Sequence, residues 1–224
     1  MESANSCQRE ERSADADSLV AKAKQLAIGN PNASAMVDLF CATTFLEQGN
    51  KEQGLHALAS MLTEYSEWLG TAEGRDMYEF IQVQRAFSLM HLGKFLEARP
   101  LLEQATQVEL DGEVMGDVHC HLAGCYHELS LYGLAKEQCE RADAFGVRQE
   151  WQPSFRYDYG HTLYELKEFQ RAKREFILCL QSGQSGPSDP APALRYSWLA
   201  ATCRKLGELS EARAYEERAR SMKP

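Results

Sequence analysis

Apolar residues recur along most of the chain three and four positions apart, which is the period of an α-helix. Leu, Phe and Tyr residues such as Phe95, Tyr126, Leu163 and Phe169 follow this period, with charged residues between them. Their spacing predicts side chains packed between neighbouring helices. The pattern therefore predicts an all-α protein.

One stretch, "HLGKFLEARPLLEQA" at residues 91–105, sets a small-residue pattern that occurs five times. Each copy has a turn residue, a small residue five positions later and another seven positions earlier. The turn residues are Gly49, Gly93, Ser130, Lys167 and Gly207. The later small residues are Gly54, Ala98, Ala135, Ala172 and Ala212, and the earlier ones are Ala42, Ala86, Ala123, Gly160 and Ala200. Twelve positions after the turn come Met61, Ala105, Ala142, Cys179 and Ala219.

These positions predict a pair of antiparallel helices in each copy. A small residue midway along each helix lets the two backbones approach closely, and a glycine in the turn can adopt the positive φ that ends a helix. A single hairpin cannot bury both of its faces, so the copies are expected to stack into an array.

The small-residue pattern resembles that of the tetratricopeptide repeat family from about Ala35 to Met222. The resemblance implies a right-handed α-solenoid of about five stacked TPR-like repeats. The expected repeats cover residues 35–69, 73–110, 113–146, 151–182 and 191–222. Three features depart from the family. The repeats are longer than the usual length of roughly 34 residues, Ser130 and Lys167 replace the turn glycine, and prolines at repeat ends are mostly missing.

The two ends of the array have their own signals. Residues 15–29 predict an extra N-terminal helix that caps the first repeat, and residues 1–14 predict a disordered polar tail. At the second-helix position that should face the following repeat, the last copy has Glu216. The other copies have Leu58, Leu102, Cys139 and Phe176 there. A charged residue at this position predicts that the array ends within this chain.

The concave groove of such an array should be lined by one stripe of each first helix. The stripe consists of the residues three before, one after and four after the small residue in the middle of each first helix. It predicts a binding groove for a partner segment, running from apolar residues through aromatic and imidazole groups to a basic end. The candidate groove residues are Val83, Phe87, Met90, His127, Tyr157, His161, Tyr164 and Arg204.

Other interpretations of these residues stay open. The stripe residues could pack within the solenoid, or the N-terminal helix could occupy the apolar part of the groove. Some members of the family bind acidic chaperone tails through a Lys/Asn/Lys/Arg clamp, but Leu39, Val83 and Cys120 at matching positions do not form one. "VHCHLAGCYHE" suggests a metal site, yet its ligands lie on different helix faces, so no metal is expected.

Composition narrows the function further. The net charge of −9 and the lack of a basic stripe argue against nucleic-acid binding. No apolar run reaches the roughly 20 residues of a membrane span, and the N-terminus lacks a secretory signal. Seven scattered cysteines without a C-x-x-C motif suit reduced thiols, so a cytoplasmic location is expected.

The expected function is a non-catalytic scaffold that binds a peptide segment of a partner protein. No nucleophile elbow, phosphate loop or H-E-x-x-H motif occurs, so neither enzyme activity nor a cofactor is expected. The alternatives are a regulatory peptide sensor and a secretion-type chaperone built on the same repeats, with self-association as a further possibility.

Overall fold

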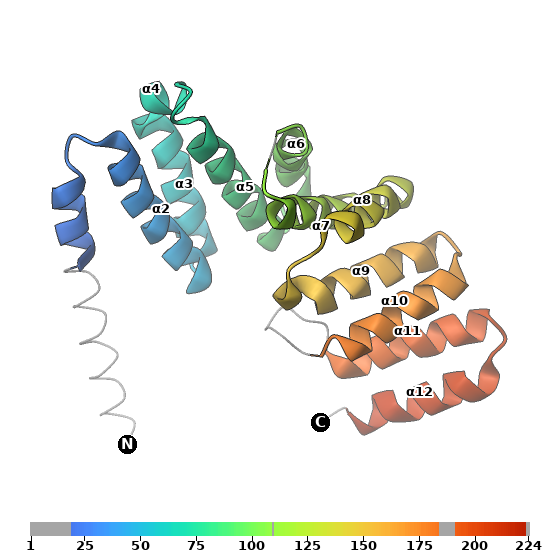
Figure 1. Cartoon of the computed structure of the whole chain (residues 1–224). Helices are drawn as coiled ribbons and strands as arrows, with labels where there is room; N and C mark the ends of the chain where they lie inside the picture. Colours follow the sequence, from blue (N-terminus) through green and yellow to red (C-terminus); the bar gives the residue numbers. More distant parts are fainter. Residues whose placement is uncertain (1–18, 109, 184–190, 223–224) are drawn as a thin grey trace, which may run out of the picture. The chain divides into compact units, whose positions relative to one another are not determined.

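The computed structural model describes residues 19–108, 110–183 and 191–222. Within these ranges every regular element is helical, and the helices follow one another in the order that the repeats predict (Figure 1). The predicted all-α repeat solenoid is confirmed. The chain divides into two compact units, residues 1–93 and residues 94–224, called the first and the second unit below.

The first unit begins with a helix at residues 19–27 and continues with four helices. They are α2 (Pro31–Glu47), α3 (Lys51–Glu64), α4 (Ser66–Leu69) and α5 (Arg75–His91). Gly29 has a φ of 84°, and the side chain of Asn30 accepts a hydrogen bond from the amide of Ala33. Residues 29–31 thus end one helix and start the next. The predicted tail at residues 1–14 lies outside the described residues, as do residues 15–18 of the predicted extra helix.

The second unit contains the remaining helices, and each of its α-helices packs on the next α-helix along the chain. They are α6 (Phe95–Ala105), α7 (Gly112–Glu128), α8 (Tyr132–Phe145), the short η1 (Gln149–Trp151), α9 (Gln152–Glu165), α10 (Phe169–Gln181), α11 (Pro192–Lys205) and α12 (Leu209–Ser221). Pro100 lies inside α6, which continues to Ala105. Among the helices that the structure describes, none combines the length and apolarity that a bilayer span requires.

The turn residues adopt one backbone conformation in all five repeats. Gly49, Gly93 and Gly207 have φ values of 72–82°, and Ser130 and Lys167 have φ values of 59° and 63°. At both non-glycine turns the next amide donates to the carbonyl five residues earlier, at 2.8 and 2.9 Å. These hydrogen bonds satisfy the last carbonyls of the first helix, so the turn is kept although a side chain there costs energy.

The small residues of the repeat pattern are all buried between helices. At Gly160 an added Cβ would lie 2.8 Å from the ring of Phe176, and at Gly116 it would lie 1.8 Å from the carbonyl oxygen of Gly146. Both distances are shorter than van der Waals contact. A side chain at either glycine would therefore clash with the neighbouring element, so both positions require the small residue found there.

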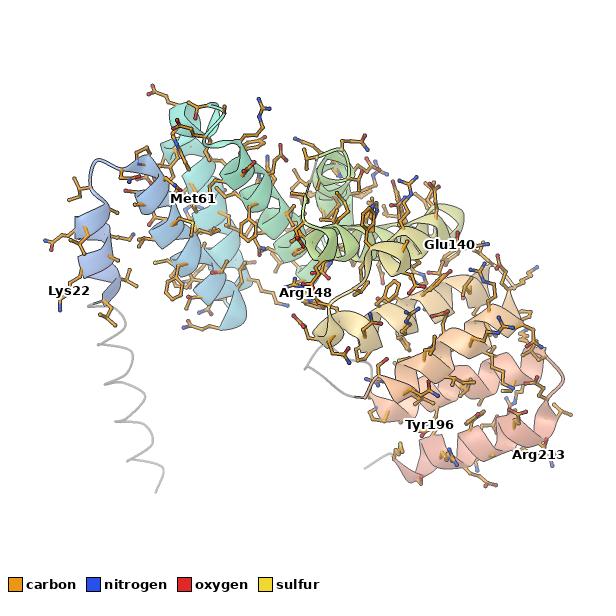
Figure 2. The ribbon with its side chains drawn as sticks, in the orientation of Figure 1. Lys22, Met61, Glu140, Arg148, Tyr196 and Arg213 are labelled. Carbon is orange, nitrogen blue, oxygen red and sulfur yellow. The ribbon has the colours of Figure 1, made fainter. Side chains whose placement is uncertain are left out.

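In the second unit, ion pairs join the second helices of successive repeats. We call these pairs the ionic ladder: Lys136–Glu168, Glu140–Arg171, Lys173–Glu208 and Lys173–Glu211, with N–O distances of 2.6–2.9 Å. Figure 2 labels Glu140 on α8, one member of the ladder. Each pair links a side chain in one repeat to a side chain in the next, so it supports stacking in addition to the buried apolar residues.

In the first unit, helix 19–27 lies against α2. Lys24 pairs with Asp38 at 2.7 Å, and Tyr65 of the connection after α3 donates to the same carboxylate at 2.5 Å. Large apolar side chains nevertheless stay exposed, including Met36 at 55% and Phe40 at 62%. A cavity of about 370 Å³ opens here. It is lined by Leu19, Val20, Ala23, Met36, Val37 and Phe40.

Candidate functional site

Three successive first helices of the second unit bring aromatic and imidazole rings together. The ring of His161 on α9 lies 4.7 Å from that of His127 on α7 and 4.2 Å from that of Trp198 on α11, measured between centroids. Tyr164 lies 5.2 Å from Trp198, and Tyr157 lies 6.3 Å from His161. We call these five side chains the aromatic ladder. All except one were predicted as groove residues, and all are half-buried.

The repeat pattern explains how the aromatic ladder is positioned. Ala123, Gly160 and Ala200 are buried midway along α7, α9 and α11, so corresponding side chains of the three helices come into register. His127 is fixed further, because its Nδ1 lies 2.9 Å from Oγ1 of Thr162 on the next first helix. The rings are thus held by rigid helices and not by loops, which lowers the entropic cost of binding.

The imidazoles of the ladder are uncharged at neutral pH. Burial lowers the pKa of His127, and burial together with the neighbouring His127 lowers the pKa of His161. Burial also raises the pKa of Tyr157, which keeps its hydroxyl protonated. The aromatic ladder is therefore a neutral, partly accessible surface of rings.

Carboxylates surround this surface. Oε1 of Glu165 lies 3.7 Å from Nε2 of His161, and Glu128 and Asp158 have exposed side chains. The side chain of Asp158 is in contact with solvent, but the surrounding protein partly desolvates it. This desolvation raises the pKa of Asp158 to about 7, and the negative charge of Glu128 raises it further. The site thus combines aromatic rings with acidic groups.

Arg204, the predicted basic end of the groove, is engaged by the chain itself. Its guanidinium pairs with Glu216 on α12, whose other oxygen lies 3.7 Å from Arg220. A cavity of about 340 Å³ lies beside this pair and is lined by Ser197, Ala200, Ala201, Arg204, Glu216, Ala219 and Arg220. The arginine is accordingly less available to a ligand carboxylate than a free guanidinium would be.

The apolar part of the predicted groove belongs to the first unit. Val83 is buried, with 1% of its surface exposed, whereas Phe87 and Met90 are half-buried on the same helix, α5. Val83 consequently contributes to packing, and Phe87 and Met90 are the two of these residues with surface that a ligand could reach.

Two members of the site were missed by the sequence reasoning. Trp198 and Asp158 lie two positions before the small residues Ala200 and Gly160, a repeat position that the predicted stripe omitted. Trp198 contacts His161 and Tyr164, so the junction between these repeats is also part of the aromatic ladder. Including that repeat position in the stripe would have found both residues.

The polar residues of α7 that suggested a metal site have protein partners. Nδ1 of His119 lies 2.8 Å from Gln138, and Nδ1 of His121 lies 2.8 Å from the carbonyl of Asp117. The buried Asp117 carboxylate pairs with Arg148, which Figure 2 labels after α8. Burial raises the pKa of Asp117, and the arginine opposes this shift.

One group of side chains where α11 meets α12 has ligand atoms close enough for a cation. Cys203, Glu208 and Glu211 place theirs within 4.8 Å of one another, among the residues that the structure describes. Nζ of Lys173 donates to both glutamates, at 2.6 and 2.8 Å. The ammonium group of the ionic ladder therefore supplies the positive charge at this place.

Comparison with solved structures supports the fold. The chain is similar to the crystal structure of BtubC (BKLC) from P. vanneervenii, with 18% identity, a TM-score of 0.69, and coverage of 95% of this chain and 90% of that one. It is also similar to the MamA RS-1 ArsTM double mutant, with 13% identity, a TM-score of 0.64, and coverage of 88% and 96%. No protein-family model and no curated protein sequence matches the chain. These likenesses, together with the repeat pattern, show a tetratricopeptide-repeat type of fold.

Proposed function

We propose that the chain is a non-catalytic scaffold that binds a segment of a partner protein along a concave groove formed by its first helices. The aromatic ladder is the observation that carries this proposal. Tyr and Trp side chains make good binding anchors because they offer large, rigid and amphipathic contact area. Their repetition on α7, α9 and α11 suits an extended or helical peptide that follows the array.

The thiols are compatible with the proposed cytoplasmic setting. Burial raises the pKa of Cys125 to about 12 and also raises the pKa of Cys139 well above its ordinary value. Thiols in this state are poor nucleophiles, which fits packing roles and a protein without catalytic chemistry.

Phe87 and Met90 on α5 belong to the proposal as a separate contact, to be tested by their own variants.

Photo-crosslinking tests the proposal in lysate of the source cells. A photo-reactive amino acid at position 165 on α9 should capture a protein, and one at position 178 on α10 should not, because only the first lies beside the aromatic ladder. The substitution His161→Ala, checked for folding by circular dichroism, should abolish the capture at position 165. Equal capture at both positions, or capture that survives His161→Ala, would show that partners bind elsewhere.

The first unit gives one observation in favour of the chaperone alternative. Its exposed Met36 and Phe40 line an apolar cavity beside α2. A chaperone would bind several unrelated apolar segments there, and Phe40→Ser would weaken all of them equally. A scaffold would bind its own partner with unchanged affinity after that substitution.

A further inference from the structure

Carboxylates beside the aromatic ladder differ from those of the ionic ladder in having no lysine or arginine partner. Among the residues that the structure describes, Glu128 and Asp158 form no ion pair with a lysine or arginine. On the second helices, by contrast, Glu140, Glu208 and Glu211 are all paired within the ionic ladder. The candidate site thus carries negative charge that no described lysine or arginine neutralises.

The rings at this place add no positive charge of their own. Glu165 and Glu128 raise the pKa of His161, but burial and the neighbouring His127 lower it more. Burial also lowers the pKa of His127, so both imidazoles are neutral. Arg204, one repeat further on, is neutralised by Glu216. A ligand that reaches the aromatic ladder therefore meets neutral π-systems flanked by anionic groups.

This combination is complementary to a guanidinium group. A cation is attracted to the face of an aromatic ring, and an arginine can stack flat on a ring while it donates to a carboxylate. A phosphate or carboxylate ligand would instead be repelled by Glu128, Asp158 and Glu165. The complementary charge also agrees with the net charge of −9, which attracts basic partners over longer distances.

We propose that the segment bound at the aromatic ladder is basic, and that one of its arginine side chains stacks on the rings while it pairs with Glu128 and Asp158. This inference rests on the proposed function and specifies the chemistry of the partner. An arginine is favoured over a lysine because a planar guanidinium can make both contacts at once.

Acidification should weaken the binding. Protonation of Asp158, whose pKa is about 7, removes a negative charge, and protonation of His127 and His161 would add positive charge. The nearby thiols of Cys120 on α7 and Cys139 on α8 stay neutral because burial raises their pKa, and Trp198 on α11 does not titrate. All titrating groups around the site therefore act in the same direction.

Short fluorescent peptides test the proposal by fluorescence anisotropy with the full chain. One peptide is rich in arginine, one carries lysine at the same positions, and one carries glutamate. The arginine peptide should bind best, and its affinity should fall between about pH 8 and about pH 6. The double variant Glu128→Gln/Asp158→Asn should weaken its binding about tenfold, as expected for the loss of two ion pairs.

A matched control separates the site from general charge attraction. Glu67→Gln/Glu217→Gln removes two exposed carboxylates on α4 and α12, helices that carry no ring of the ladder, and should change the affinity less than twofold. Equal losses in both double variants would overturn the proposal. Binding of the glutamate peptide at the ladder, lost in His161→Ala, would also overturn it while the scaffold function stands. If a segment captured from lysate does not depend on the ladder at all, the scaffold function fails too.

Discussion

The two units use the same helical hairpin but treat their surfaces differently. In the first unit, α2 leaves Met36 and Phe40 exposed beside an apolar cavity. In the second unit, the second helices are joined by the ionic ladder and the first helices carry rings and carboxylates. The small residues that bring the helices together are buried in both units. The difference shows that the repeat pattern specifies the framework, while the surface residues between its fixed positions specify what each unit can bind.

The largest expected effect comes from the closest backbone contact. In Gly116→Ala, the new Cβ would collide with the carbonyl oxygen of Gly146, and we expect a loss of about 3 kcal/mol in the free energy of unfolding. In the first unit, Gly54→Ala meets the flexible side chain of Leu46 and should cost less. Urea unfolding followed by circular dichroism measures both. As a control, Gly133→Ala enters open space near the start of α8 and should leave stability unchanged or slightly higher. A Gly116→Ala variant as stable as Gly133→Ala would contradict the packing described for α7.

The ionic ladder predicts a salt-dependent difference between the units. Lys173 is paired with Glu208 and Glu211, and these bonds raise its pKa, so Lys173→Met should cost about 1–2 kcal/mol at low salt. The cost should shrink in concentrated salt, because added ions screen the pairs. Lys22→Met in the first unit removes an exposed lysine and serves as the control. The urea midpoints of both variants are measured at increasing salt concentration. If the two midpoints changed alike with salt, the ionic ladder would have no role in stability.

Substitutions at the turns should change the stability of the two units in opposite directions. Lys167→Gly should stabilise the second unit by about 1 kcal/mol, because glycine adopts its positive φ without the steric cost of a side chain. Gly49→Ala should destabilise the first unit by a similar amount for the same reason. Thermal unfolding midpoints of the two variants should shift in opposite directions. A downward shift in Lys167→Gly would mean that the lysine side chain makes a compensating interaction.

Much of the framework could be predicted because each turn and each close contact between helices depends on a single residue at a fixed repeat position. The small residues and turn positions follow from backbone distance and φ, and Ser130 and Lys167 keep the turn conformation even without glycine. The aromatic ladder was predicted in part, since His127, Tyr157, His161 and Tyr164 share the chosen stripe. Trp198 and Asp158 lie at a neighbouring position, and whether such a residue faces the core or the surface depends on how closely the next helix packs.

The ionic ladder and the pairing of Arg204 were not predicted for a related reason. Lys173 bonds to residues more than thirty positions away, and Glu216 reaches Arg204 from the other helix of the hairpin. Single-helix patterns indicate which face a charge occupies, but the partner depends on the stacking of separate helices. Long flexible side chains therefore carry little information about their partners in the sequence alone.

The smallest expected effect tests whether Asp158 is retained at a cost to folding. Its pKa in the folded chain is about 7, above the ordinary value of about 4, so between these values the folded protein holds a proton that the unfolded chain releases. The stability of the wild type should fall as the pH rises through this window. Asp158→Asn cannot titrate, so its advantage should be absent near pH 4 and greatest above pH 7, and it should stay modest because solvent reaches the side chain. Urea midpoints of the two proteins across this range measure the difference. An asparagine variant less stable than the wild type at high pH would mean that the carboxylate stabilises the fold. The expected gain in stability, combined with weaker peptide binding, would instead mark Asp158 as a residue that serves binding at the expense of stability.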